Sequence, residues 1–164
     1  MLLRIGLLLT FLLSVAAPAH AADFAFETWF AGKSRAMGSF RAINGVKRTF
    51  EVALNGKWDG RTLTLREDFV YDDGERDTKT WRFVKTGKGA YTGTREDVVG
   101  ATKVTIKGDT ARFSYKVYLD GKNRKNLVSF SDVMRLGKDG RVVNTAIVSK
   151  FGIPVARTKV VFSR

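Results

Sequence analysis

Four polar side chains fall on the apolar faces of predicted β-strands, and they are the residues of this sequence best placed to do chemistry. Within residues 63–71, Glu67 has the parity of leucine, phenylalanine and tyrosine neighbours, and Asp132 has an equivalent place within residues 127–136. Asp97 and Asn144 hold similar positions in two further alternating segments. Because side chains of one parity project from one face of a strand, we expect this group to enter one enclosed space.

Three interpretations of these buried polar groups are open. Burying an ionised carboxylate costs several kcal/mol unless it has partners, so the acids could form ion pairs with Arg82, Arg95 or Arg157 and be chemically idle. They could instead orient an amphiphile in an apolar pocket. Two of them could also serve as general acid and base, although the sequence gives no separation between them.

Aromatic residues of the same strand faces would supply the apolar wall of such a pocket. The predicted ligand-binding set combines polar and aromatic residues: Glu67, Asp97, Asp132, Asn144, Trp81, Phe83, Phe113, Tyr115 and Phe130. We assign no catalytic residue and prefer, to an enzyme, a periplasmic lipocalin-like protein that binds a lipid or other small amphiphile. The alternatives are an accessory enzyme that acts on modified acyl chains through Glu67 and Asp132, and a structural envelope protein with a filled interior.

Short alternating segments separated by turn residues must position these side chains. Residues 110–119 alternate most clearly, and Asp-Gly or Asn-Gly turns follow several segments. The pattern predicts an all-β protein: a single antiparallel up-and-down barrel of about 8–10 strands, lipocalin- or calycin-like, whose closure removes exposed edges. The aromatic residues 24–30 predict a short N-terminal helix or plug. A barrel of this size is either filled or holds one small ligand.

The N-terminal residues have the pattern of a cleavable signal peptide over residues 1–21. Arg4 precedes an apolar run, and Ala19-His20-Ala21 is a small-x-small cleavage site. The run is shorter than the roughly 20 residues of a membrane-spanning helix. We therefore predict one β-barrel domain over residues 22–164, exported to the periplasm as a soluble protein. Because the sequence contains no cysteine, we predict that it is not a lipoprotein.

Composition excludes several kinds of site and partner. With no cysteine, and with His20 as its single histidine, the mature protein could not use thiol or imidazole catalysis, disulfides or a nitrogen-and-sulfur zinc site. We predict no metal and no cofactor. The acidic turn at residues 72–77 lacks the order of an EF-hand calcium loop, so a solvated turn is preferred there. The formal net charge of +13 favours an anionic membrane surface as a partner. We do not expect nucleic acid as a partner, because the aromatic residues alternate into the interior.

An ordered set of short motifs resembles the bacterial DUF3833 family over nearly the whole mature chain. The motifs are Glu67-x-Phe69, Asp73-Gly74, Trp81, Tyr91-x-Gly93, Asp97-Val98-Val99-Gly100, Gly108-Asp109-x-Ala111, Tyr115, Asp132-x-Met134, Asn144 and Lys150-Phe151-Gly152. The resemblance implies a small exported or lipid-anchored envelope protein with a lipocalin-like barrel. It also implies a link to fatty-acyl or membrane-lipid modification. Two departures are the missing lipobox cysteine and Val133, where relatives tend to have tryptophan.

Overall fold

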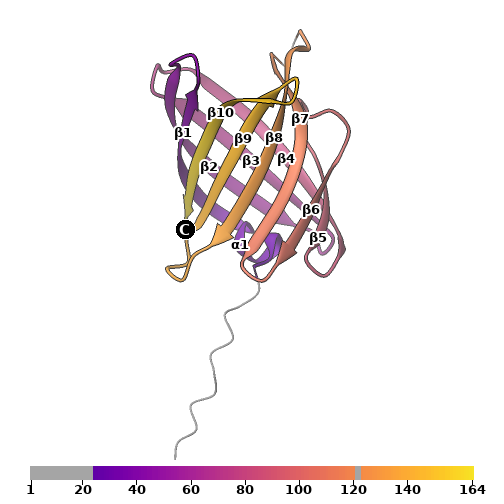
Figure 1. Cartoon of the computed structure of the whole chain (residues 1–164). Coiled ribbons are helices and arrows are strands. Elements are labelled where there is room, and N and C mark those ends of the chain that lie inside the picture. The colour runs from indigo at the N-terminus through magenta and orange to yellow at the C-terminus, as the bar shows by residue number, and fades with distance from the viewer. Residues whose placement is uncertain (1–23, 121–122) are drawn as a thin grey trace, which may run out of the picture.

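The computed structural model describes residues 24–120 and 123–164, and their strands close into one antiparallel barrel (Figure 1). The elements are α1 (Phe26–Trp29), β1 (Gly32–Ala42), β2 (Lys47–Trp58), β3 (Thr62–Tyr71), β4 (Arg76–Gly87), β5 (Ala90–Thr94), β6 (Thr102–Lys107), β7 (Thr110–Asp120), β8 (Lys125–Leu136), β9 (Val142–Lys150) and β10 (Ile153–Ser163). The predicted signal peptide lies outside the described residues and stays a prediction. No helix in the described part of the chain is long and apolar enough to span a bilayer.

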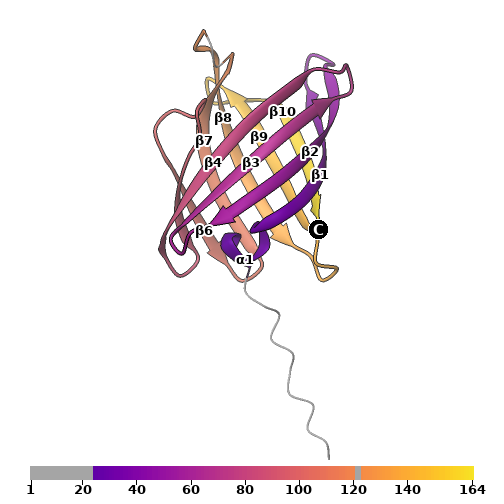
Figure 2. The same ribbon diagram turned by 180° about the vertical axis from the view of Figure 1, so that it is seen from behind.

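Each strand pairs with its neighbours in the chain, and β1 pairs with β10 to close the sheet. This is the up-and-down barrel that the alternation predicts, and the short N-terminal helix is also confirmed. In both views, α1 covers one end of the barrel (Figure 2). Four hairpins, between β1 and β2, β3 and β4, β7 and β8, and β9 and β10, stand at the opposite end.

The interior contains two apolar clusters. The larger one, here called the α1-side core, includes Phe26, Trp29 and Phe30 of α1 together with inward residues of the strands. Phe26 packs against Phe83 and Tyr91, with ring centroids 5.0 and 5.2 Å apart. The smaller one, the hairpin-side core, lies toward the hairpins and consists of Val117, Val128, Val148 and Ala156 with partly buried neighbours.

Two strand boundaries differ from the sequence-based expectation. The pair Asn55-Gly56 is typical of a turn that ends a strand, but β2 continues to Trp58. The cause is packing, because a Cβ at Gly56 would overlap the carbonyl oxygen of Phe30, so glycine lets α1 approach the strand closely. The alternation over residues 90–99 likewise predicts a strand that reaches Val99. Instead, β5 ends at Thr94 and the following loop keeps only one bridge, from Val98 to Val117.

Candidate functional site

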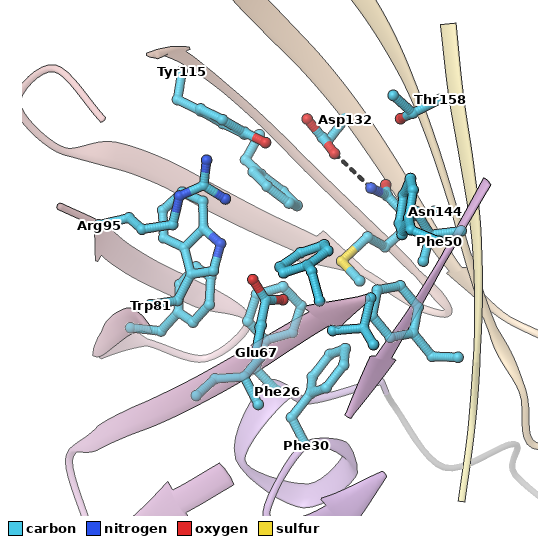
Figure 3. Close-up of a pocket in the computed structure, with 18 residues that line it drawn as sticks. Phe26, Phe30, Phe50, Glu67, Trp81, Arg95, Tyr115, Asp132, Asn144 and Thr158 are labelled. Atoms are coloured by element: carbon cyan, nitrogen blue, oxygen red, sulfur yellow. Dashed lines mark hydrogen bonds between the residues drawn. The ribbon is translucent and has the colours of Figure 1, made fainter. Parts of the chain in front are cut away.

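A cavity of about 130 Å³ lies inside the barrel next to α1. Its walls are mainly aromatic and aliphatic, with a few polar groups on the side away from α1 (Figure 3). The lining residues are Phe26, Phe30, Phe50, Val52, Leu65, Glu67, Phe69, Trp81, Phe83, Arg95, Phe113, Tyr115, Asp132, Met134, Asn144, Thr158, Val160 and Phe162. Tyr115 packs against both cores, so the polar groups near it mark the boundary between them.

Asp132 and Asn144 form the best-defined polar contact of the cavity. They come from neighbouring strands, because Met134 of β8 pairs with Asn144 of β9. Asn144 Nδ2 donates a hydrogen bond of 2.5 Å to Asp132 Oδ1 (Figure 3). Asp132 Oδ2 and Asn144 Oδ1 are buried, and neither has a hydrogen-bond partner among the described residues. Both free oxygens are acceptors, so each of them can accept a hydrogen bond from a donor group of a ligand.

Glu67 is the second buried carboxyl group of the cavity, and it has no partner among the described residues. It sits on β3 with 9% of its surface exposed, and its side chain forms neither a hydrogen bond nor an ion pair with any residue that the structure describes. Lys79 pairs with it in the strand register. However, Lys79 Nζ lies 3.0 Å from Asp77 Oδ2 and 3.1 Å from Asp97 Oδ2, so Asp77 and Asp97 hold this cation.

Burial is the main influence on the protonation of Glu67 and Asp132. It raises the pKa of Glu67 to about 7, and the nearby carboxylates oppose ionisation further while Arg95 favours it. Burial also raises the pKa of Asp132 to about 6, against the hydrogen bond from Asn144 and the charge of Arg95. The removal of water disfavours the charged form of a carboxyl group. Near neutral pH, both groups can therefore either donate or accept a proton.

Asp97 behaves differently, because it is fully paired. Arg95 Nε lies 2.6 Å from Asp97 Oδ1, and Lys79 contacts the other carboxylate oxygen. Burial alone would raise the pKa of Asp97, but the two cations outweigh it and hold the pKa below its ordinary value. The Arg95 guanidinium also lies 4.8 Å from the centre of the Trp81 ring. Asp97 thus anchors Arg95 at the cavity wall.

The structure brings together most of the predicted site residues. Seven line the cavity, namely Glu67, Trp81, Phe83, Phe113, Tyr115, Asp132 and Asn144. Asp97 lies outside the lining, behind Arg95. Phe130 packs with the hairpin-side core and stacks on Tyr115 at 5.4 Å. Whether the seven bind a ligand stays a prediction.

Sequence reasoning missed several lining residues. Arg95 was considered only as a partner for buried acids, although its shared parity with Asp97 placed both on one face. Phe26 and Phe30 were assigned to a plug, and α1 brings both to the cavity wall. Phe50 and Thr158 have the parity of inward neighbours on β2 and β10, so alternation alone could have found them.

The acidic turn at residues 72–77 is occupied by protein partners. Arg48 Nη2 lies 2.8 Å from both Asp73 Oδ2 and Glu75 Oε2. Asp72 accepts hydrogen bonds from the backbone amide and hydroxyl group of Thr49. Across the described ranges, no cluster of three or more His, Cys, Asp or Glu residues has the arrangement of a metal site. Ion pairs and turn hydrogen bonds therefore account for the acids of this hairpin.

Comparison with known proteins supports the family and the fold. A family model described as "Protein of unknown function (DUF3833)" matches residues 14–164, and no curated protein matches. Among solved structures, the S-type phycobiliprotein lyase CPES from Guillardia theta aligns with a TM-score of 0.59 and 11% identity, over 85% of this chain and 90% of that one. Rv2717c from M. tuberculosis aligns with a TM-score of 0.57 and 12% identity, over 82% and 92%. These likenesses establish a shared barrel fold.

Proposed function

Because this chain belongs to the DUF3833 family, whose description assigns no activity, we propose a function from the geometry of its cavity. The protein binds one small amphiphile inside the barrel, with an apolar part against the aromatic wall and a polar end at Asp132 and Asn144. One observation carries the proposal, namely two buried acceptor oxygens without partners in an otherwise apolar cavity. The proposed setting is the periplasm, after export.

The chemistry of the polar end follows from these acceptors. A buried polar group without a partner costs about 1–3 kcal/mol, so a ligand that donates to Asp132 Oδ2 and Asn144 Oδ1 recovers that energy. Glu67 offers a further acceptor when ionised. A hydroxyl, amide or protonated amine can donate in this way, whereas an ionised fatty acid brings only acceptors and a like charge. The favoured ligand therefore has a donating head group.

The size of the cavity limits how much of the ligand is enclosed. Its volume of about 130 Å³ is below the about 300–1,000 Å³ of pockets that hold drug-sized molecules. A long acyl chain would not fit within it as it stands. The proposal for a lipid is therefore that one end of the molecule enters the barrel. The fold is compatible with such a role, since barrels of this size commonly hold one small ligand.

A matched set of probes tests the proposal. We expect 1-octanol and octylamine to bind at pH 8, as measured by calorimetry, and octanoate to bind at least about tenfold more weakly, because like charges close together are disfavoured. Asp132→Ala should weaken the binding of 1-octanol and octylamine. Asp139→Ala is the matched control, because Asp139 is an exposed partner of Arg141 and does not line the cavity. Absence of binding by all three probes, together with no ligand in native mass spectra of the exported protein, would refute the proposed function.

A second candidate function rests on the raised pKa values of Glu67 and Asp132. Carboxyl groups with pKa values near the working pH are suited to proton transfer, so the pair could act on a bound acyl chain. If so, cells with the unchanged protein and cells without it would differ in lipid composition. Glu67→Gln and Asp132→Asn would each abolish this difference while the variants remain folded. Unchanged lipid profiles in both variants would reject this candidate and leave the binding proposal intact.

A further inference from the structure

Large apolar side chains are exposed on three hairpins at the end of the barrel opposite α1. They lie in pairs: Ile43 and Val46 between β1 and β2, Leu119 and Leu127 at the β7–β8 hairpin, and Phe151 and Ile153 between β9 and β10. Phe151 is 94% exposed, Ile43 77% and Ile153 65%. At the α1 end, the turns within the described residues expose no large apolar side chain. We call the described residues of these hairpins, 43–46, 119–120, 123–127 and 151–153, the apolar tips.

The apolar tips are neighbours in space. Around the barrel the strand order runs β2, β1, β10, β9, β8, β7, so the three hairpins follow one another along a continuous arc. The backbone amide of Ile43 donates a hydrogen bond of 2.9 Å to the carbonyl oxygen of Val155, which joins the first hairpin to the start of β10. Both ribbon views place them at the end away from α1. Contiguous exposed apolar groups of this kind mark interaction sites.

Basic side chains accompany the apolar tips. Arg41 and Lys47 flank the first hairpin, Arg124 and Lys125 belong to the second, and Lys150 precedes Phe151. Among the described residues, none of these five forms an ion pair with an acid. Apolar tips surrounded by unpaired cations suit a surface that offers hydrocarbon and negative charge together.

We propose that the apolar tips dock the protein on a bilayer that contains anionic phospholipid. The apolar side chains enter the headgroup region and the Lys and Arg side chains face lipid phosphates. Such binding combines buried apolar area with electrostatic attraction. The β3–β4 hairpin stands at the same end but carries Asp72, Asp73 and Glu75, so the barrel tilts toward the β7–β10 side. The unpaired cations beside these apolar side chains favour an anionic lipid surface over a second copy of this basic chain.

Co-sedimentation of the exported protein with vesicles tests this proposal. We expect binding to vesicles of phosphatidylcholine mixed with phosphatidylglycerol, and much weaker binding to phosphatidylcholine alone. A tip variant with Ile43→Ser, Phe151→Ser and Ile153→Ser should bind at least about tenfold more weakly, because three large apolar side chains would no longer enter the bilayer. The matched control is Met37→Ser with Ile147→Ser, two exposed apolar residues on the barrel wall. This control should bind as the unchanged protein does.

Charge and self-association are tested in the same assay. Arg124→Gln with Lys125→Gln should weaken binding by about tenfold and reduce its salt dependence. Circular dichroism and the midpoint of thermal unfolding verify that every variant is folded. The proposal is overturned if the tip variant binds like the unchanged protein, or if the wall control loses as much. It is also overturned by the following pair of results. Light scattering shows that the unchanged protein is a dimer and the tip variant a monomer, and the unchanged protein does not bind the vesicles. Octanol binding in the cavity is measured separately, so either proposal can fail alone.

Discussion

The two ends of the barrel use the same kinds of residue in opposite ways. At the α1 end, Phe24, Phe26, Trp29 and Phe30 are all buried, and Trp29 Nε1 donates a hydrogen bond of 3.0 Å to the carbonyl oxygen of Gly140. At the hairpin end, aromatic and branched side chains point into solvent. The first end closes the core and the second remains available for contact. The difference shows that only the α1 end is closed by its own aromatic side chains, and the proposed docking would use the opposite end.

The largest expected difference between the two ends is in the free energy of unfolding that is lost when an aromatic ring is removed. Phe26→Ala should lower the free energy of unfolding by about 3–5 kcal/mol, because it removes a buried ring from the α1-side core. Phe151→Ala should change it by less than about 0.5 kcal/mol, because that ring is exposed. Urea unfolding of both variants measures the difference. Equal losses in the two variants would abolish the distinction between a sealed and an exposed end.

The buried acids Glu67 and Asp132, which lie between the two ends, should make the stability of the protein depend on pH. Folding raises the pKa of Glu67 from 4.5 to about 7, so the unfolded chain releases this proton first as pH rises. Stability should therefore be highest below pH 4.5 as far as Glu67 is concerned, and should fall by about 3 kcal/mol as pH rises through 7. The charged groups around it are Lys79 on β4, Arg95, Glu96 and Asp97 after β5, and Asp132 on β8. Asp132 adds a smaller loss of the same sign as pH rises to about 6.

Glu67→Gln should remove most of this pH dependence. Denaturant titrations of the variant and the unchanged protein between pH 4.5 and 8 measure it, and the variant should be the more stable of the two at pH 8. A wild-type stability that rises across this interval would show that Glu67 has a partner that the geometry does not provide.

A smaller effect concerns the fit of α1 against β2. Gly56→Ala should destabilise the protein by about 1–3 kcal/mol, because the added methyl group would overlap the carbonyl oxygen of Phe30. Gly87→Ala is the matched control, since its added Cβ would meet only Ala90 at an ordinary distance of 3.9 Å. Thermal unfolding compares the two variants. If Gly87→Ala is the more harmful, close packing of α1 is not what requires glycine at position 56.

The smallest effect belongs to the acidic hairpin at the exposed end. Arg48→Gln removes the ion pairs with Asp73 and Glu75, whose side chains are more than half exposed. Pairs of this kind contribute up to about 1 kcal/mol, so the loss should be below that value and should shrink in high salt. Chemical denaturation at two salt concentrations measures it. A loss comparable to that of Phe26→Ala would mean that this hairpin supports the barrel as strongly as α1 does.

Alternation along the sequence predicts most of the barrel, because the inward positions of a closed sheet are mostly apolar. A polar residue at an inward position is therefore conspicuous in the sequence. Alternation places Glu67 and Asp132 inside, and the structure agrees. It cannot show that Arg95 and Lys79 both form ion pairs with Asp97 while Glu67 has none. Which groups pair depends on how far each side chain extends across neighbouring strands. Nor can alternation show that β2 continues through Gly56, because the reason lies in α1, far away in the sequence. Cavity volume likewise depends on how the aromatic rings pack.

The contact between Arg164 and α1 constrains how the barrel assembles. Its guanidinium group donates hydrogen bonds to the carbonyl oxygens of Thr28 and Trp29, including one of 2.8 Å across a separation of 135 residues. Contacts between such distant parts of a chain form late, since they require closure of a long loop. The contact that holds α1 over this end is therefore completed only when the first and last strands, β1 and β10, have paired. A ligand of the proposed kind that enters through the α1 end would have to do so before this contact forms.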